Sequence, residues 1–130
     1  MSAHKMASIA ILAAMGGGLA AGCVSDRSTG NETLTATTCS APSSAAGATV
    51  VFIRSFTFDP NAIHIKAGGS VAWVNCEPTN IPHTATDDAG SYDSGSLSPG
   101  AAYVKSFATP GTFDYHCAIH PGMKASVVVE

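Results

Sequence analysis

The sequence has few charged residues and little positive charge. Only 12% of its 130 residues are Asp, Glu, Lys or Arg, and just six of them are Lys or Arg. Lys5 is the one basic residue within residues 1–22, so the rest of the chain carries five basic residues against nine acidic ones, a net charge of about −4. Binding to nucleic acid requires a basic surface. The composition therefore excludes nucleic acid as a partner.

Long amphipathic helices are missing from the chain after residue 47. Short segments rich in β-branched and aromatic residues stand there instead, with turn residues such as Gly68-Gly69 and Pro110-Gly111 between them. These segments cover residues 48–54, 56–58, 63–65, 71–75, 103–107, 112–116 and 124–129. Short strands at this spacing are typical of an all-β sandwich or barrel. We therefore predict one all-β domain over residues 48–130, small enough to gain from a disulfide or a metal.

The main apolar run, residues 6–21 (MASIAILAAMGGGLAA), is too short to span a bilayer comfortably. It follows Lys5 and suits the apolar region of a secretory signal. The alternative is a buried core helix, but the triple glycine at residues 16–18 would weaken a helix interior. We predict that residues 1–22 are a signal peptide and that the protein is exported.

Residues 19–23 (LAAGC) place Cys23 after small residues, a pattern that resembles the bacterial lipobox, although Ala20 stands where that motif prefers leucine. The resemblance implies a lipid on Cys23 that attaches the protein to a membrane. The alternative is ordinary cleavage nearby, with Cys23 left as a thiol. Residues 25–47 are rich in Ser, Thr, Ala and Gly and contain no aromatic residue. We expect residues 23–47 to form a flexible tether.

Cysteine is scarce, with four residues in the chain: Cys23, Cys39, Cys76 and Cys117. If Cys23 carries a lipid and Cys117 binds a metal, Cys39 and Cys76 remain to form a disulfide in an oxidising compartment. The alternative is two unpaired thiols, and the sequence alone leaves other pairings open.

Methionine is also scarce: outside the predicted signal peptide, the chain has only Met123. In the segment YHCAIHPGM (residues 115–123), Cys117, His120 and Met123 follow one another at intervals of three. A lone methionine is more often a core residue. Beside Cys-x-x-His, however, it completes a soft ligand set, because two histidines, a thiolate and a weak axial methionine describe a blue-copper site. Tetrahedral zinc seldom uses methionine.

The second histidine of such a site must come from another part of the chain. His83 is the candidate, since it ends the segment NCEPTNIPH (residues 75–83), shortly after the predicted strand at residues 71–75. His64 lies between two isoleucines that we expect to point inward, so its side chain should face solvent. His116 should point to the opposite face of its strand from Cys117, and we expect it to bind no metal.

These segments together resemble the small cupredoxins, that is, plastocyanin, pseudoazurin and especially amicyanin. Residues 115–123 are similar to amicyanin's short ligand loop, with two residues between histidine and methionine. Residues 71–75 and Pro82-His83 are similar to the strand and loop that bring the first histidine. The family's framework spacing is matched by Phe56-x-Phe58-x-Pro60, Ile63-x-Ile65, Gly68-Gly69 and Gly111-x-Phe113-x-Tyr115-x-Cys117. The resemblance covers about residues 48–130.

The resemblance implies an all-β Greek-key sandwich or barrel of about eight strands with one mononuclear type 1 copper. It implies that His83, Cys117, His120 and Met123 are the copper ligands. The implied function is one-electron transfer between a redox donor and an acceptor protein outside the cytoplasm, on the periplasmic or cell-surface side. Saturated ligation leaves no open position for a substrate, so we expect no enzymatic activity. We also expect a monomer.

The ring edge of His120 is expected near the surface, where electrons leave. An apolar rim of Ile81, Pro82, Ile119 and Pro121 is the expected docking patch, since transient redox contacts are small. Asp87, Asp88 and Asp93 are most simply solvated, with a docking surface for a basic partner as a weaker interpretation.

One position departs from the family pattern: Thr84 stands where the family often has an asparagine that links the two ligand loops. The backbone N–H of Thr84 can still donate to the Cys117 sulfur, but the sequence does not predict a side-chain link. We expect an effect on reduction potential or loop rigidity.

Two other functions compete with electron transfer. One is copper storage or delivery, and the other is a purely structural exported β-domain.

Overall fold

The computed structural model describes residues 39–130, so the predicted signal peptide, Cys23 and the first part of the predicted tether lie outside the described residues. Within these bounds the chain forms eight strands and one short 3-10 helix, η1 (Ser43–Ala45). The strands are β1 (Thr49–Arg54), β2 (Thr57–Asp59), β3 (Ala62–Ile65), β4 (Ser70–Asn75), β5 (Thr86–Asp87), β6 (Ala102–Ser106), β7 (Gly111–His116) and β8 (Lys124–Val129). The prediction of an all-β domain with about eight strands is confirmed.

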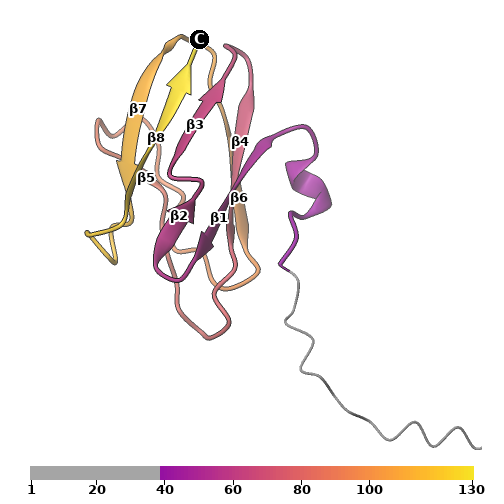
Figure 1. Cartoon of the computed structure of the whole chain (residues 1–130), viewed down its shortest axis with the longest axis vertical. Coiled ribbons are helices and arrows are strands. Elements are labelled where there is room, and N and C mark those ends of the chain that lie inside the picture. Colours follow the sequence, from indigo (N-terminus) through magenta and orange to yellow (C-terminus); the bar gives the residue numbers. More distant parts are fainter. Residues whose placement is uncertain (1–38) are drawn as a thin grey trace, which may run out of the picture. The chain divides into compact units, whose positions relative to one another are not determined.

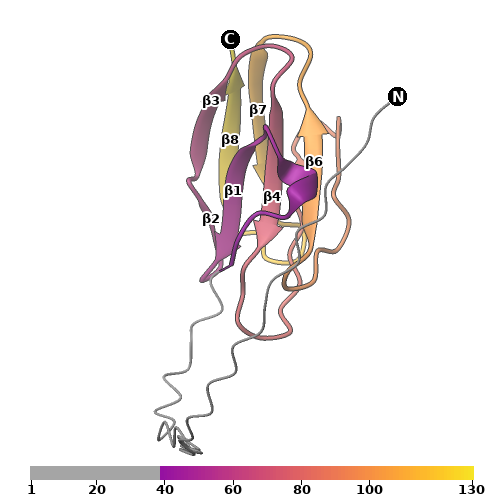
Figure 2. The same ribbon diagram turned by 90° about the vertical axis from the view of Figure 1, so that its right-hand side faces the viewer.

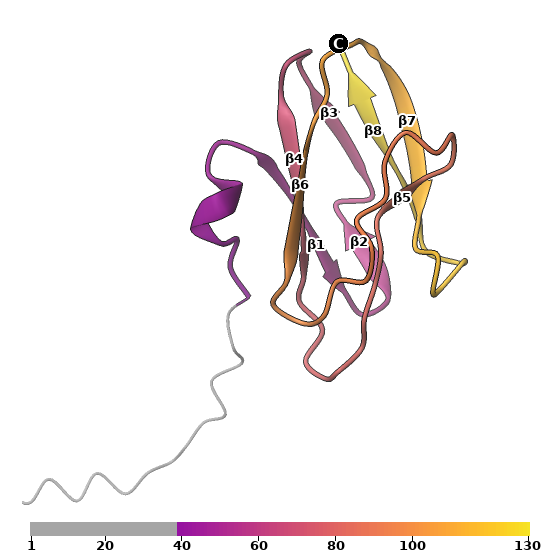
Figure 3. The ribbon, with the colours of Figure 1, turned by 180° about the vertical axis from the view of Figure 1, so that it is seen from behind.

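The strands form two four-stranded sheets, in the orders β2-β1-β4-β6 and β3-β8-β7-β5. Two pairs are parallel, β1 with β4 and β3 with β8, and the remaining pairs are antiparallel. Figure 1 and Figure 3 show the loop after β7, the loop after β4 and the β1–β2 turn at the same end of the domain, away from the C-terminus. This end carries the candidate site.

The core lies between the two sheets and follows from the alternation of apolar residues along the strands. Val51 and Ile53 of β1 are buried, Val50 and Phe52 are intermediate, and Arg54 is exposed. Trp73 of β4 is fully buried and contacts aromatic rings from both sheets. Its ring centroid lies 5.4 Å from that of Tyr115 in β7 and 5.8 Å from that of Tyr103 in β6. These contacts hold β7 against the core, and they thereby fix the position of Cys117, which follows β7 directly.

A disulfide joins Cys39 to Cys76, with 5.5 Å between their Cα atoms, which is within the usual range. The predicted pairing of these two cysteines is therefore confirmed. Figure 2 shows η1 in front of the sheet that contains β4 and β6, and η1 contacts β6. Ala45 of η1 is buried, so the range predicted as tether contains residues that pack onto the sandwich.

Two local expectations were wrong. Phe56 lies in a turn between β1 and β2 and not in a strand, because Ser55 and Phe56 both adopt the left-handed backbone conformation, with φ of 51° and 58°. Asp87 is buried and not solvated, since its side-chain Oδ2 accepts a hydrogen bond from the Ser91 backbone N–H at 2.8 Å. Among the described residues no helix has the length and apolarity to cross a membrane.

Candidate metal centre

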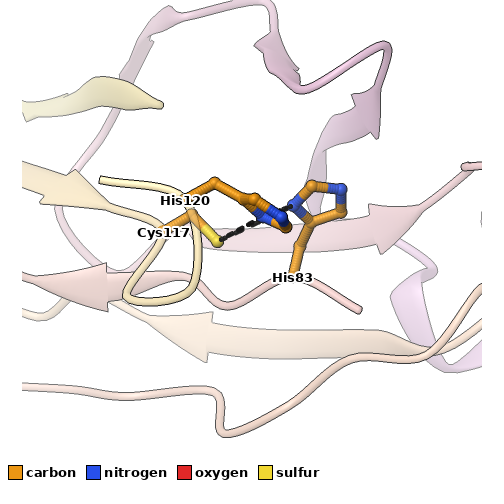
Figure 4. A group of neighbouring side chains, drawn as sticks. All are labelled: His83, Cys117 and His120. Carbon is orange, nitrogen blue, oxygen red and sulfur yellow. Dashed lines mark hydrogen bonds between the residues drawn. The ribbon is translucent and has the colours of Figure 1, made fainter. Parts of the chain in front are cut away.

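Three side chains predicted as ligands meet at one end of the sandwich (Figure 4). The Cys117 Sγ lies 3.7 Å from the Nδ1 of His83 and 3.7 Å from the Nδ1 of His120. The two Nδ1 atoms are 3.2 Å apart. Cys117 and His83 have no solvent exposure, whereas His120 is partly exposed. Three soft or borderline donor atoms thus face one another, and of the three residues only His120 reaches the surface.

The loop after β7 carries three of the four predicted ligands. It starts at Cys117, directly after β7 ends at His116, and it ends at Met123, directly before β8. Cys117 N–H donates to the Met123 carbonyl at 3.1 Å, and Met123 N–H donates to the His120 carbonyl at 2.9 Å. Met123 is buried in the same apolar cluster as Cys117. The backbone therefore fixes the loop and keeps these three residues together.

His83 reaches the site from the long connection between β4 and β5. Its backbone pairs with Leu97, with N–H to carbonyl distances of 3.1 and 2.7 Å. The buried Asn75 at the end of β4 donates through its Nδ2 to the carbonyls of Ile81 and Leu97, at 2.9 and 2.8 Å. Its Oδ1 also accepts from the Glu77 N–H at 3.0 Å. One amide side chain thus holds the loop that presents His83.

Glu77 is a site residue that the sequence reasoning missed. Its carboxylate is buried, and its Oε1 lies 3.2 Å from Nε2 of His83 and accepts the Phe56 backbone N–H at 2.8 Å. A carboxylate facing Nε2 fixes the proton on that nitrogen and leaves the Nδ1 lone pair for a metal. Burial lowers the pKa of His83 below its ordinary value, the hydrogen bond to Glu77 opposes this, and the nearby His120 adds to the lowering. His83 is thus a neutral ligand candidate.

The three donor atoms lie close enough together for one metal ion to reach all of them. Zinc–nitrogen and zinc–sulfur bonds, for comparison, are about 2.0 and 2.3 Å. The donor separations of 3.2, 3.7 and 3.7 Å are each shorter than two such bonds end to end. A His₂Cys trigonal set is the donor arrangement of blue-copper sites. The chemistry and the spacing of the donors therefore suit copper.

Thr84 links the two ligand-bearing loops. Its backbone N–H donates to the Cys117 Sγ at 3.3 Å, as predicted. Its Oγ1 also accepts the Ala118 backbone N–H at 2.8 Å, a side-chain link that the sequence did not predict. Both bonds act across a sequence separation of more than thirty residues, so Thr84 holds the Cys117 loop against the His83 loop.

Apolar side chains lie on the surface around His120. Phe56 is 47% exposed and Ile119 is 44% exposed. The Phe56 ring packs edge-on against both candidate ligand rings, with its centroid 5.0 Å from that of His120 and 5.6 Å from that of His83. The sequence reasoning placed Ile119 in this surface but missed Phe56, because the turn that brings it there is visible only in the backbone.

The remaining histidines of the described chain lie outside the cluster. His64 is exposed and its Nδ1 lies 3.2 Å from a Glu130 carboxylate oxygen, as expected for a solvent-facing residue. His116 pairs with the Asp88 carboxylate at 2.5 Å. Neither belongs to the group of candidate ligands.

Residues 45–130 match the sequence model of the copper binding proteins of the plastocyanin/azurin family. This match covers more than half of the chain and includes both ligand-bearing loops. The chain therefore belongs to the plastocyanin/azurin family of copper-binding proteins, and it holds one type 1 copper.

Within that family the chain is similar to amicyanins and plastocyanins. It is 37% identical over 91 residues to amicyanin from Paracoccus denitrificans, which covers 66% of this chain and 68% of the relative. Plastocyanin from Scenedesmus fuscus is 33% identical over 84 residues, covering 56% of this chain and 86% of the relative.

A solved structure of a reduced Cu(I) form of an amicyanin variant superposes with a TM-score of 0.60 at 34% identity, covering 65% of this chain and 83% of that one. A copper-containing nitrite reductase from Thermus scotoductus gives a TM-score of 0.61 at 26% identity, covering 64% of this chain but only 22% of the larger protein.

Proposed function

We propose that this protein carries single electrons between redox partner proteins, and that His83 Nδ1, Cys117 Sγ, His120 Nδ1 and the thioether of Met123 would hold its copper. The observation that carries the proposal is the triangle of two imidazole nitrogens and one thiolate sulfur, with edges of 3.2, 3.7 and 3.7 Å. Bound copper would take up and release one electron by alternating between Cu(II) and Cu(I).

The protein's own residues keep the donor atoms in place while the charge of the site changes. Cys117 and His83 are buried and held by backbone pairing, and the Thr84 N–H stabilises the thiolate charge. Little needs to move when an electron arrives, which favours fast transfer. Three strong donors and one axial donor also leave no position for a substrate, which supports a carrier and not an enzyme.

Electrons would enter and leave at His120, the one member of the triangle that is partly exposed. The exposed side chains of Phe56 and Ile119 provide an apolar surface beside it, together with Ile81, Pro82 and Pro121. A small apolar contact of this kind suits a transient redox complex. The protein would act as a monomer.

Export from the cytoplasm is also part of the proposal. The disulfide between Cys39 and Cys76 supports an oxidising compartment, such as the periplasm or the cell surface. The expected signal peptide over residues 1–22 and the lipid on Cys23 agree with this location. Mass spectrometry of the mature protein tests both: we expect an N-terminal Cys23 with added acyl mass, and an unmodified N-terminus would reject the lipid.

Adding Cu(II) to the purified protein tests the carrier function. We expect an intense blue colour that ascorbate bleaches and a mild oxidant restores, and Cys117→Ser should abolish the colour, because thiolate-to-copper charge transfer produces it. Copper bound without colour would favour storage or delivery instead. Absence of tight copper binding would favour a purely structural domain.

A further inference from the structure

A continuous chain of hydrogen bonds leads from the candidate copper loop to the protein surface. It begins at the Ala118 backbone N–H, next to Cys117, which donates to the Thr84 Oγ1 at 2.8 Å. The Thr84 Oγ1 lies 2.9 Å from the Thr86 Oγ1. The Thr86 Oγ1 in turn lies 3.3 Å from the Asp93 Oδ1. Burial decreases along this path, since Thr84 is buried, Thr86 is intermediate and Asp93 is exposed.

The two ends fix the direction of every bond in the chain. A backbone N–H such as that of Ala118 can only donate, and an ionised carboxylate such as that of Asp93 can only accept. Thr86 must therefore donate its single hydroxyl proton to Asp93, and Thr84 must donate its own to Thr86. Thr84 Oγ1, which donates its proton to Thr86, keeps its lone pairs for the Ala118 N–H. Bonds in such a chain polarise and strengthen one another.

The backbone that carries these side chains is held independently of them. Thr86 pairs with His116 of β7 and forms a bridge with Asp93. Ser94 N–H donates to the Ala85 carbonyl at 3.1 Å. Loss of one hydroxyl should therefore leave the local fold intact and change only the orientation of the Thr84 hydroxyl.

We propose that Thr86 and Asp93 are positioning residues of the copper site that act through Thr84. They orient the Thr84 hydroxyl toward Ala118, which keeps the Thr84 N–H on the Cys117 sulfur. Of the four proposed copper ligands, the proposal depends only on Cys117. It identifies Asp93, an exposed residue of a polar loop, as a residue on which the electronic properties of the thiolate depend.

A double-mutant cycle between Thr84→Val and Thr86→Val tests this coupling. In the metal-free protein we expect Thr86→Val to speed hydrogen exchange of the Ala118 amide by about fivefold, the order expected when one hydrogen bond is weakened. In the Cu(II) protein the same change should shift the reduction potential and the intensities of the thiolate charge-transfer bands. Both effects should disappear in the Thr84→Val background.

Two further variants extend the test. Asp93→Ala should give the same changes as Thr86→Val but of smaller size. Thr86→Ser keeps the hydroxyl and should therefore keep the wild-type exchange rate, potential and band intensities.

Matched controls are Thr112→Val and Asp114→Ala, which remove a hydroxyl and a carboxylate from exposed positions on β7. The proposal would be overturned if Thr86→Val had equal effects in the wild-type and Thr84→Val backgrounds. It would also be overturned if those effects were no larger than the effects of the two control variants. The proposed function is tested independently of this positioning role. A wild-type protein that binds copper without blue colour would reject electron transfer. The hydrogen-exchange rate of the Ala118 amide in the metal-free protein would still test whether Thr86 and Asp93 position Thr84.

Discussion

Glu77 and His83 form a buried carboxylate–imidazole pair, with 3.2 Å between the Glu77 Oε1 and the His83 Nε2. The same carboxylate oxygen accepts the backbone N–H of Phe56, the residue whose ring packs on both candidate ligand histidines. Glu77 thus connects the β1–β2 turn to the buried histidine and places a negative charge behind it. A nearby negative charge favours Cu(II) over Cu(I), because the oxidised ion carries more positive charge.

Glu77→Gln should raise the reduction potential while the protein keeps its colour. Glutamine retains an oxygen that can accept from the Phe56 backbone N–H and from the His83 Nε2–H, but it removes the negative charge. Charge-assisted hydrogen bonds are roughly twice as strong as neutral ones. We expect a change of about 1 kcal/mol, or roughly fivefold in the ratio of Cu(II) to Cu(I) affinity. Cyclic voltammetry measures this change. Glu130→Gln, which alters the exposed pair with His64, is the control and should leave the potential in place. An unchanged potential in Glu77→Gln would mean that Glu77 has only a structural role.

Met123→Leu should keep the blue colour and raise the potential. Leucine has a similar volume and suits the buried position, but it removes the thioether that would stabilise Cu(II) along the axis. Voltammetry and the electronic spectrum of the same sample measure the two effects. A variant with the potential and the spectrum of the wild type would show that Met123 is a core residue and not a ligand.

Ile119→Lys should slow electron exchange between oxidised and reduced copies of the protein. Ile119 is 44% exposed and is adjacent in sequence to His120, so a lysine there places like charges opposite each other when two copies meet through this face. The exchange rate is measured by NMR line broadening in mixtures of the two redox states. Val104→Lys adds the same charge at another exposed apolar residue, in β6, and should have a smaller effect. Equal rates for the two variants would reject His120 as the exit.

Loss of the disulfide should lower stability more than it alters the copper site. Cys39 and Cys76 are 37 residues apart, a loop for which the chain-entropy model gives about 3–4 kcal/mol at 25 °C. The Cys76 N–H still donates to the Ile53 carbonyl at 2.7 Å, so the start of the His83 loop remains anchored. Urea unfolding of the double variant Cys39→Ser, Cys76→Ser measures the stability loss. Loss of the blue colour in the folded variant would show that the disulfide also shapes the site.

The stability of the protein should fall above pH 10. Burial raises the pKa of Tyr115 from 10.0 to about 12. Between these values the unfolded chain releases the phenolic proton while the folded chain retains it, so stability is lost as pH rises through this window. A difference of that size corresponds to about 2–3 kcal/mol. Burial also raises the pKa of Tyr103, whose ring is only partly buried. Denaturant titrations from pH 9 to 12 should therefore show a flatter decline for Tyr115→Phe than for Tyr103→Phe, and both should be flatter than the wild type. Parallel curves would contradict this.

The strand framework could be predicted from the sequence because it depends on local patterns. Alternation of apolar residues marked β3 and β6, and runs of β-branched residues marked β1 and β8. Cys117, His120 and Met123 are close in the sequence because they share one loop. His83 could be named only from its place shortly after the predicted strand at residues 71–75 and from the family resemblance, since nothing local connects it to a residue 34 positions away.

The outer contacts of the site could not be predicted because they depend on backbone conformation. Glu77 reaches His83 only through the path that Asn75 imposes on the intervening loop, and Phe56 reaches both histidines only through a turn with positive φ. Asp87 is buried through a turn of its own chain. In each case the residue type alone was typical of a solvated or framework position.

Spectroelectrochemistry of the copper-loaded protein decides whether this site carries electrons. The blue absorbance is followed while the electrode potential is stepped in both directions. We expect an absorption band that depends on Cys117, one copper per chain, and a one-electron titration curve that is the same in both directions over repeated cycles. A colourless copper protein, or colour that is lost and does not return on reoxidation, would contradict the claim that this site carries electrons.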